Sequence, residues 1–329
     1  MIQKKDLKAR IAITGSTGHL GSVLIPMLVQ QGYALQCLYR KDKLSIEDDH
    51  LTWIQGDLRD NTSSHELLKG ADVLIHCASL ISVGEGNRKE VFQVNVEGTR
   101  RLIAHCLKEQ VRMIYISSST ATMPANDRKN LDEKAPLVHS QEFYYGWTKA
   151  RAEELVNEAV AKEGLDAIIL RPTALVGPPD SQPSRFGQTI FDLHAGKLPM
   201  ISTGGYDLLD IRDFSQTVIN SMEMGQKGEV YLTGGNFYTL KSLAKLVKPE
   251  KIPPVISVNL LIRLLPLIRL YARVFPLRSP INRESLLTLK KAPEMVDSSK
   301  ARKHLLHQSR SLKESVHDLI EWKNKTTPK

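Results

Sequence analysis

The sequence predicts an α/β fold built on a doubly wound parallel sheet, and three observations support this prediction. Short apolar runs alternate with segments of helical spacing through the first two thirds of the chain. A glycine-rich turn directly follows the first apolar run. Several of the runs are apolar at nearly every position, as strands buried on both faces of a sheet are. The last third is helical with scattered prolines, so we expect a smaller, mostly helical C-terminal region beside the sheet.

The glycine-rich turn predicts a Rossmann-type nucleotide site. A strand is expected over 10–14 and a helix over 22–31, with Gly32 ending the helix. Glycines let the backbone approach a pyrophosphate, and a helix N-terminus offers free N–H groups with partial positive charge. The alternative is a tight turn without a ligand, and the spacing G-x-x-G-x-x-G differs from the commoner G-x-G-x-x-G. The expected cofactor contacts in this turn are Gly15, Thr17, Gly18, His19 and Leu20.

The end of the second expected strand, 34–39, indicates which dinucleotide binds. An acid here usually holds the ribose of NAD, whereas an arginine accommodates the 2′-phosphate of NADP. Arg40 stands at this place, so NADP is favoured, with NAD as the alternative because Asp42 lies nearby. The competing interpretation is a solvated basic turn. A third strand is expected over 53–58, where Asp57, followed by Leu58, is expected to accept a hydrogen bond from the adenine amino group.

Two polar residues lie in otherwise apolar elements. The fourth expected strand, 72–79, contains His76, which we interpret as a hydrogen-bonded core residue rather than a base. A long helix is expected over 87–110, and Asn95 lies inside it although Asn is a poor helix former. Asn95 is therefore either a solvated residue or a polar relay next to the site.

A hydroxyl cluster and a Tyr-x-x-x-Lys pair supply the chemistry. Ser117-Ser118-Ser119-Thr120 follow the fifth expected strand, 111–116, where side chains face the ligand crevice of an open sheet. Tyr145 and Lys149 are four residues apart at the start of an expected helix, so they share one face. We expect the ammonium to lower the phenol pKa, which suits proton transfer near neutral pH. Alone, the pair fits an ordinary amphipathic helix; with the glycine turn and the hydroxyls it predicts an active site.

The expected domains are discontinuous in sequence. Residues 1–177 and 206–236 are expected to form the dinucleotide-binding domain, and 178–205 with 237–329 the substrate-binding domain. The strongly apolar stretch 255–275 carries arginines and a proline, so it is not expected to span a membrane. A helical lid over an apolar substrate is favoured there, and an interfacial helix is the alternative.

The charge and the cysteines limit the kinds of partner and compartment that we expect. The 329 residues carry a net charge of +9, from 45 Lys and Arg against 36 Asp and Glu. Such charge attracts an anionic cofactor, a nucleic acid or a membrane surface. No nucleic-acid motif accompanies it, so we expect no nucleic-acid partner, and a weak membrane-surface contact stays open.

Three scattered cysteines, without C-x-x-C or H-E-x-x-H, indicate reduced core residues of a cytoplasmic protein without a metal site. We expect a monomer or homodimer.

Taken together, the motifs resemble the extended short-chain dehydrogenase/reductase superfamily, also called the NAD-dependent epimerase/dehydratase family, from Ile11 to Trp322. The run 74–84 is most similar to the branch of 3β-hydroxysteroid dehydrogenases and dihydroflavonol reductases. His19 and Thr148 depart from the usual residues, and Ala121-Thr122 replace the acidic pair of nucleotide-sugar 4,6-dehydratases, so elimination lacks its acid and base. The matching motifs are Thr14-Gly15-x-x-Gly18-x-x-Gly21, Gly56-Asp57-Leu58, His76-x-Ala78, Asn95-x-x-Gly98-Thr99, Ser117-Ser118-Ser119, Tyr145-x-x-x-Lys149 and Arg171-Pro172-Thr173.

The resemblance implies a catalytic tetrad of Asn95, Ser119, Tyr145 and Lys149, with Thr120 and Ser118 as alternatives to Ser119. It implies further cofactor contacts from Ala78, Ser79, Lys149 and Pro172. The implied activity is an NADP-dependent reduction of a carbonyl, or oxidation of the alcohol, in a small apolar sterol-, flavanonol- or aldehyde-like substrate. Tyr145 would protonate the oxygen, Ser119 would polarise it, Lys149 would hold the ribose, and Asn95 would support a proton relay. The alternatives are a nucleotide-sugar epimerase with tightly bound NAD and a non-catalytic NADP-binding redox sensor.

Overall fold

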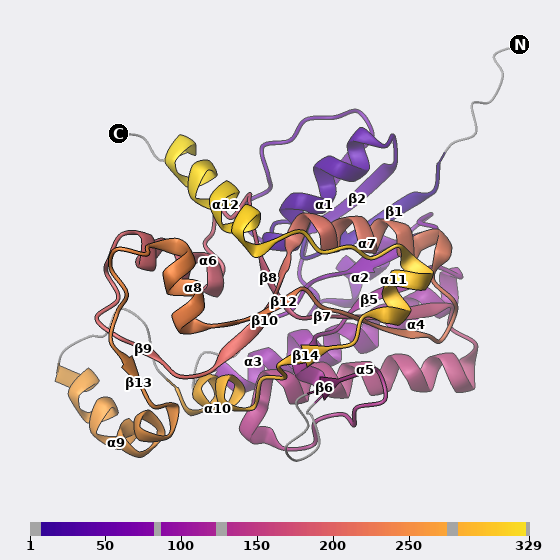
Figure 1. The fold of residues 1–329 in the computed structure, drawn as a ribbon. Coiled ribbons are helices and arrows are strands. Elements are labelled where there is room, and N and C mark those ends of the chain that lie inside the picture. Colours follow the sequence, from indigo (N-terminus) through magenta and orange to yellow (C-terminus); the bar gives the residue numbers. More distant parts are fainter. Residues whose placement is uncertain (1–7, 82–86, 123–129, 275–281, 327–329) are drawn as a thin grey trace, which may run out of the picture.

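The computed structural model describes residues 8–81, 87–122, 130–274 and 282–326. Its centre is a seven-stranded sheet in which all neighbouring strands are parallel, in the order β11-β7-β5-β4-β1-β2-β3 (Figure 1). The order reverses between β1 and β4, which is the switch point where such sheets bind ligands. The strands are β1 (Arg10–Thr14), β2 (Ala34–Tyr39), β3 (Leu51–Gln55), β4 (Val73–His76), β5 (Arg112–Ile116), β7 (Ala167–Pro172) and β11 (Val230–Thr233). The predicted doubly wound parallel sheet is therefore confirmed.

Helices cover both faces of this sheet, as the nearly continuous apolar strands require. Successive strand residues point to opposite faces, so Ile11 and Ile13 join one buried cluster and Ala12 joins the other. The first cluster includes residues of α1 (His19–Gln30), α7 (Ile211–Met224) and α11 (Ser299–Leu305). The second includes residues of α2 (Asn61–Leu68), α4 (Gly98–Glu109) and α5 (Tyr144–Glu163).

The C-terminal region is smaller and adds short strands to its helices. β8 (Ala174–Val176), β10 (Gly205–Asp210) and β12 (Asn236–Thr239) form one sheet. β9 (Ile201–Ser202) pairs with β13 (Val255–Ile256), and β6 (Asn130–Leu131) pairs with β14 (Met295–Val296). Its helices are α6 (Arg185–His194), α8 (Leu240–Val247), α9 (Val258–Val274), α10 (Arg283–Lys291) and α12 (Leu312–Thr326).

The predicted domain boundaries stay a prediction, although the strand pairing bears on one of them. Residues 206–236 are predicted to belong to the dinucleotide-binding domain. In the structure, β10 pairs with β8 and β12 in the separate small sheet, and the chain then returns to the large sheet through α7 and β11.

Candidate active site

A cavity of about 630 Å³ lies at the carboxyl ends of the central strands and extends to the C-terminal region. Asn95 is absent from its described lining, but the other residues that the sequence proposed for catalysis or cofactor binding share this cavity. Their individual roles stay predictions. These lining residues are Gly15, Thr17, Gly18, His19, Leu20, Arg40, Asp57, Leu58, Ala78, Ser79, Ser119, Tyr145, Lys149 and Pro172.

The glycine turn packs closely against neighbouring backbone and leads into a helix with free donors. Gly15 has a φ of +70°, and a Cβ there would lie 2.7 Å from the backbone nitrogen of Ala78. A Cβ at Gly21 would lie 2.4 Å from the carbonyl oxygen of Gly15, so neither position tolerates a side chain. Within the described part of the chain, no side chain caps α1 at Gly18. The N–H groups of the first turn of α1 can therefore donate to an anion such as a pyrophosphate.

Charged residues mark the outer end of the cavity. Arg40 follows β2 with an exposed side chain. The Asp57 carboxylate accepts from the Nε and Nη2 atoms of Arg59, at 2.9 and 2.7 Å. The hydrogen bond from the Arg59 side chain lowers the pKa of Asp57, and the charge of Arg40 adds to this effect. The predicted contact of Asp57 with adenine stays a prediction, and its pairing with Arg59 was not foreseen.

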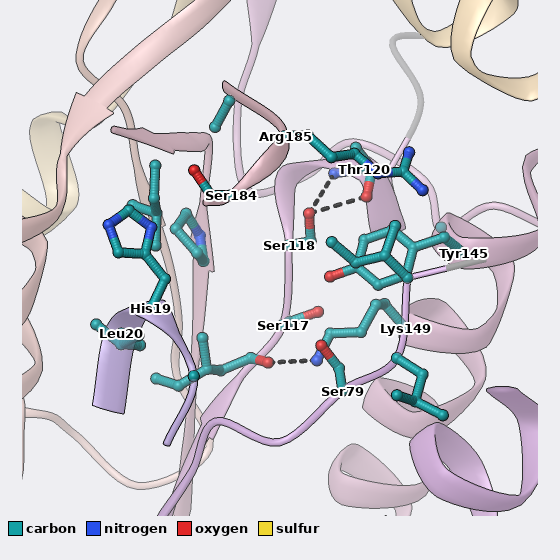
Figure 2. Close-up of a pocket in the computed structure, with 18 of the residues that line it drawn as sticks. His19, Leu20, Ser79, Ser117, Ser118, Thr120, Tyr145, Lys149, Ser184 and Arg185 are labelled. Carbon is teal, nitrogen blue, oxygen red and sulfur yellow. Dashed lines mark hydrogen bonds between the residues drawn. The ribbon is translucent and has the colours of Figure 1, made fainter. Parts of the chain in front are cut away.

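Helix α5 carries Lys149 into the centre of the site. The Lys149 ammonium donates to the carbonyl oxygen of Ile116, at the end of β5. The same Nζ lies 4.6 Å from the ring centroid of Tyr115. Burial lowers the pKa of Lys149 to about 8. Figure 2 shows Lys149 below the Tyr145 ring, with Ser79 beside it.

The expected lowering of the Tyr145 pKa is wrong in this structure. Burial raises the pKa of Tyr145, and a hydrogen bond with the Ser79 side chain and the charge of Arg185 only partly oppose this. Lys149 directs its ammonium to the Ile116 carbonyl instead of to the phenol. Its ordinary pKa of 10 and the raised one both leave the phenol neutral at neutral pH, as a proton donor must be.

The hydroxyl cluster turns back toward Tyr145. Ser118 begins a 3₁₀ turn, and its Oγ lies 2.8 Å from Oγ1 of Thr120. Figure 2 shows both hydroxyls on the same side of the site as Tyr145. Ser117 instead donates to the buried carboxylate of Glu153, at 2.7 Å. A Cβ at Gly146 would lie 2.3 Å from the carbonyl oxygen of Thr120, so the glycine after Tyr145 allows α5 to contact this turn.

Asn95 is buried outside the described cavity lining and connects two elements of the site. It lies in a π-helical turn, Gln93–Glu97, between α3 (Arg88–Phe92) and α4, within the predicted long helix. Its side-chain amide is buried, accepts from Leu80 N at 2.7 Å, and donates to Leu80 O at 2.9 Å and to Thr148 Oγ1 at 3.0 Å. The solvated interpretation of Asn95 is thus excluded, and its proton-relay role stays a prediction. These contacts join the loop after β4 to α5.

Two further sequence interpretations can be compared with the structure. His76 is buried and its ring nitrogens lie 2.7 Å from Thr14 Oγ1 and 2.9 Å from Thr99 Oγ1, which confirms a hydrogen-bonded core histidine. Cys37 and Cys106 are buried as expected. Cys77, in contrast, is only partly buried and lines the cavity.

Residues of the C-terminal region complete the cavity, and sequence reasoning missed them. They include Arg185 and Phe186 of α6, Tyr206 of β10, and Glu284 and Thr288 of α10. Glu284 accepts from the backbone nitrogen of Tyr145 at 2.8 Å, across 139 residues of sequence. Asn282 caps α10 in a way that signals a helix start, but no local pattern shows which cavity that helix faces.

Within its described residues, the segment 255–275 does not form the expected lid over the cavity. Residue 275 is outside the described residues, and none of the described residues of α9 lines the cavity, whereas α10 does. α9 packs against the other side of α10 through a shared apolar cluster. The wall next to Tyr145 is therefore α10.

The chain belongs to the NAD dependent epimerase/dehydratase family, whose model matches residues 11–234. It is 32% identical to sterol demethylase protein B of Methylococcus capsulatus, over 94% of this chain and 97% of that protein. It is 30% identical to a putative dihydroflavonol 4-reductase of Synechocystis, over 69% of this chain and 66% of that protein. These matches confirm the resemblance and make the chain an NAD(P)-dependent oxidoreductase of this family.

Solved structures agree on the fold. The crystal structure of gox2253 superposes with a TM-score of 0.82 at 28% identity, covering 96% of this chain and 98% of that one. The UDP-glucose 4-epimerase of Thermotoga maritima gives a TM-score of 0.77 at 18% identity, covering 96% and 99%, which shows the fold alone.

Proposed function

We propose that this protein is an NADP-dependent carbonyl reductase, or an alcohol dehydrogenase in the reverse direction, for a small apolar substrate. The observation that carries the proposal is Tyr145 in the wall of a cavity that runs from the glycine turn to α10. Beyond Tyr145, the lining includes the apolar side chains of Ile81, Phe143 and Phe186. The relatives named for sterol and dihydroflavonol chemistry support a substrate of this kind.

A nicotinamide dinucleotide fits the residues present. The glycine turn and the first turn of α1 would hold its pyrophosphate, Arg40 the 2′-phosphate and Lys149 the nicotinamide ribose. When bound, this cofactor supplies a hydride to the carbonyl carbon or accepts one from the alcohol. The uncapped start of α1 supports this assignment, because its free N–H groups lie next to cavity-lining residues of the glycine turn.

The protein's own residues would manage the proton. Tyr145, which is neutral at pH 7, donates its phenolic proton to the carbonyl oxygen as that oxygen gains negative charge. A hydroxyl of the 118–120 turn donates a hydrogen bond to the same oxygen and stabilises the developing charge. One hydride and one proton convert the carbonyl to the alcohol.

Replacing Tyr145 tests this proposal. Tyr145→Phe keeps the ring but removes the proton donor, so hydride transfer should slow by about 10²–10⁴-fold while NADPH still binds. Tyr144→Phe is the matched control, because the Tyr144 hydroxyl donates to the Arg88 carbonyl at 2.8 Å and does not line the described cavity. The measurement is single-turnover NADPH oxidation with a panel of sterol ketones, flavanonols and aldehydes. If Tyr145→Phe stays within threefold of the wild type, the proposed mechanism is wrong.

Arg40 tests the choice of cofactor. Arg40→Ala should weaken NADPH binding by roughly tenfold to a hundredfold and leave NADH binding nearly unchanged, because a charge-assisted phosphate contact is lost. Lys43→Ala, in the same exposed turn but outside the described cavity lining, is the control and should have little effect. Titration of both cofactors by fluorescence gives the dissociation constants. A wild-type preference for NADH would contradict the assignment of NADP.

A further inference from the structure

Helix α9 presents apolar side chains to solvent as well as to the protein. Its inner face packs against α10, through a cluster that contains Val258, Leu261, Leu265, Leu286 and Leu289. Its outer face carries leucines at positions i, i+4 and i+7, which form one stripe along a helix. The exposed fraction of the side chain is 46% for Leu260, 38% for Leu264 and 64% for Leu267. Figure 1 shows α9 at the edge of the molecule, away from the seven-stranded sheet.

The net charge of the chain is concentrated in the stretch of sequence that contains this helix. Residues 241–291 hold eleven of the 45 Lys and Arg residues but only two of the 36 acidic ones. The remaining 34 basic and 34 acidic residues balance, so this segment accounts for the whole net charge of +9. Several of its cations have exposed side chains: Lys241 and Lys245 on α8, Lys251 before β13, Arg263 on α9 and Lys290 on α10.

The exposed leucines and the positive charge together indicate which kind of partner could cover the leucine stripe. A second copy of the chain placed on α9 would bring the same excess of positive charge and be repelled. An anionic bilayer attracts basic side chains and also takes leucines into its interfacial layer. Among the described residues, no helix is long and apolar enough to cross a membrane. The combination of charge and exposed leucines therefore fits a helix that lies in the plane of the bilayer surface.

We propose that α9 binds the surface of an anionic lipid bilayer, with Leu260, Leu264 and Leu267 inserted and with Arg263 and the other exposed lysines and arginines of 241–291 attracted to the headgroups. α10 packs on α9 and lines the cavity, so binding would hold that wall of the cavity near the lipid, where an apolar substrate dissolves. This consequence rests on the proposed function, whereas the lipid binding does not.

Vesicle flotation of the full chain tests the proposal without any substrate. The probes are vesicles of pure phosphatidylcholine and vesicles with 30 mol% phosphatidylglycerol. The wild type should float with the anionic vesicles at low and physiological salt, and binding should weaken at high salt. Replacing all three outer leucines with glutamine keeps helix propensity and should weaken binding roughly tenfold or more.

A matched variant removes exposed apolar surface elsewhere. Met224→Gln combined with Leu306→Asn changes side chains that are 42% and 59% exposed, outside the 241–291 segment, and should bind vesicles like the wild type. NADPH binding and melting temperature should be unchanged in both variants, which separates loss of docking from loss of folding. The proposal is overturned if the wild type does not float with anionic vesicles, or if the triple variant floats equally well. It is also overturned if sedimentation shows a wild-type dimer that the triple variant abolishes.

Discussion

At the scale of single residues, Ser118 and Ser119 are two candidates for the hydroxyl that polarises the substrate oxygen. The sequence favoured Ser119, but Ser118 is the residue whose Oγ contacts Thr120 on the Tyr145 side of the cavity (Figure 2). We therefore expect Ser118→Ala to slow hydride transfer by about 10²–10³-fold, as removal of an oxyanion donor does. Ser119→Ala should stay within threefold of the wild type. Single-turnover kinetics of both variants decide between them, and the opposite ranking would restore Ser119.

Lys149 gives a prediction for the pH dependence of stability. Its folded pKa of about 8 lies below the ordinary value of 10.5, so burial disfavours its charged form. This penalty is complete below pH 8 and fades as the pH rises to 10.5, because the unfolded chain binds the extra proton in that window. Relative to Lys149→Met, the wild type should gain on the order of 3 kcal/mol in unfolding free energy between pH 7.5 and 10.5.

Urea unfolding at several pH values measures this difference. Lys245→Met, at an exposed position on α8, is the control and should keep a constant offset from the wild type. Parallel curves for the wild type and Lys149→Met would show that burial does not shift the lysine in the folded chain. The difference between the two proteins is the relevant quantity, because other groups titrate in both.

Residues on local motifs could be predicted, and residues brought in by tertiary contacts could not. Gly15, Tyr145 and Lys149 were found because strand, turn and helix spacing place them at one edge of the sheet. Arg185 and Glu284 reach the same cavity only through the packing of α6 and α10. The shift of the Tyr145 pKa was misjudged for a related reason, since burial and the direction of the lysine amine depend on the whole site.

At the scale of elements, period and glycine placement located the large strands and helices within a few residues. Strand β2 matches its expected range, 34–39, because alternating segments and turn residues bound it on both sides. The small strands β9 and β13 have two residues each, which is too short to produce a pattern. The π-helical turn at Asn95 was also not predicted, since one inserted residue leaves the helical spacing on either side intact.

For helix α9, the sequence predicted an apolar helix but not its position relative to the cavity. Its composition predicted a helix with apolar contacts, but a lid and an interfacial helix require the same residue types. The structure shows that α10 occupies the cavity wall and that the three outer leucines are exposed, and the interfacial helix stays a proposal. Placement relative to a cavity is a long-range property that helical spacing does not encode.

At the scale of the whole molecule, a carboxylate of the C-terminal region contacts the start of α5. Phe143 provides no side-chain cap for α5, and Glu284 of α10 instead accepts from the backbone nitrogen of Tyr145 at 2.8 Å. A negative group at a helix N-terminus satisfies a free N–H and interacts favourably with the helix dipole. We therefore expect the position of Tyr145 to depend on α10.

Replacing Glu284 should uncouple the two regions. Glu284→Ala removes the cap, so we expect unfolding free energy to fall by about 1 kcal/mol and kcat to fall roughly tenfold as Tyr145 loses its fixed orientation. Glu284→Gln retains an acceptor but not the charge, and should recover most of kcat. The dissociation constant of NADPH should change less than twofold in both, because the glycine turn and Arg40 lie at the other end of the cavity. An alanine variant with wild-type kcat and melting temperature would show that Tyr145 is positioned by α5 alone.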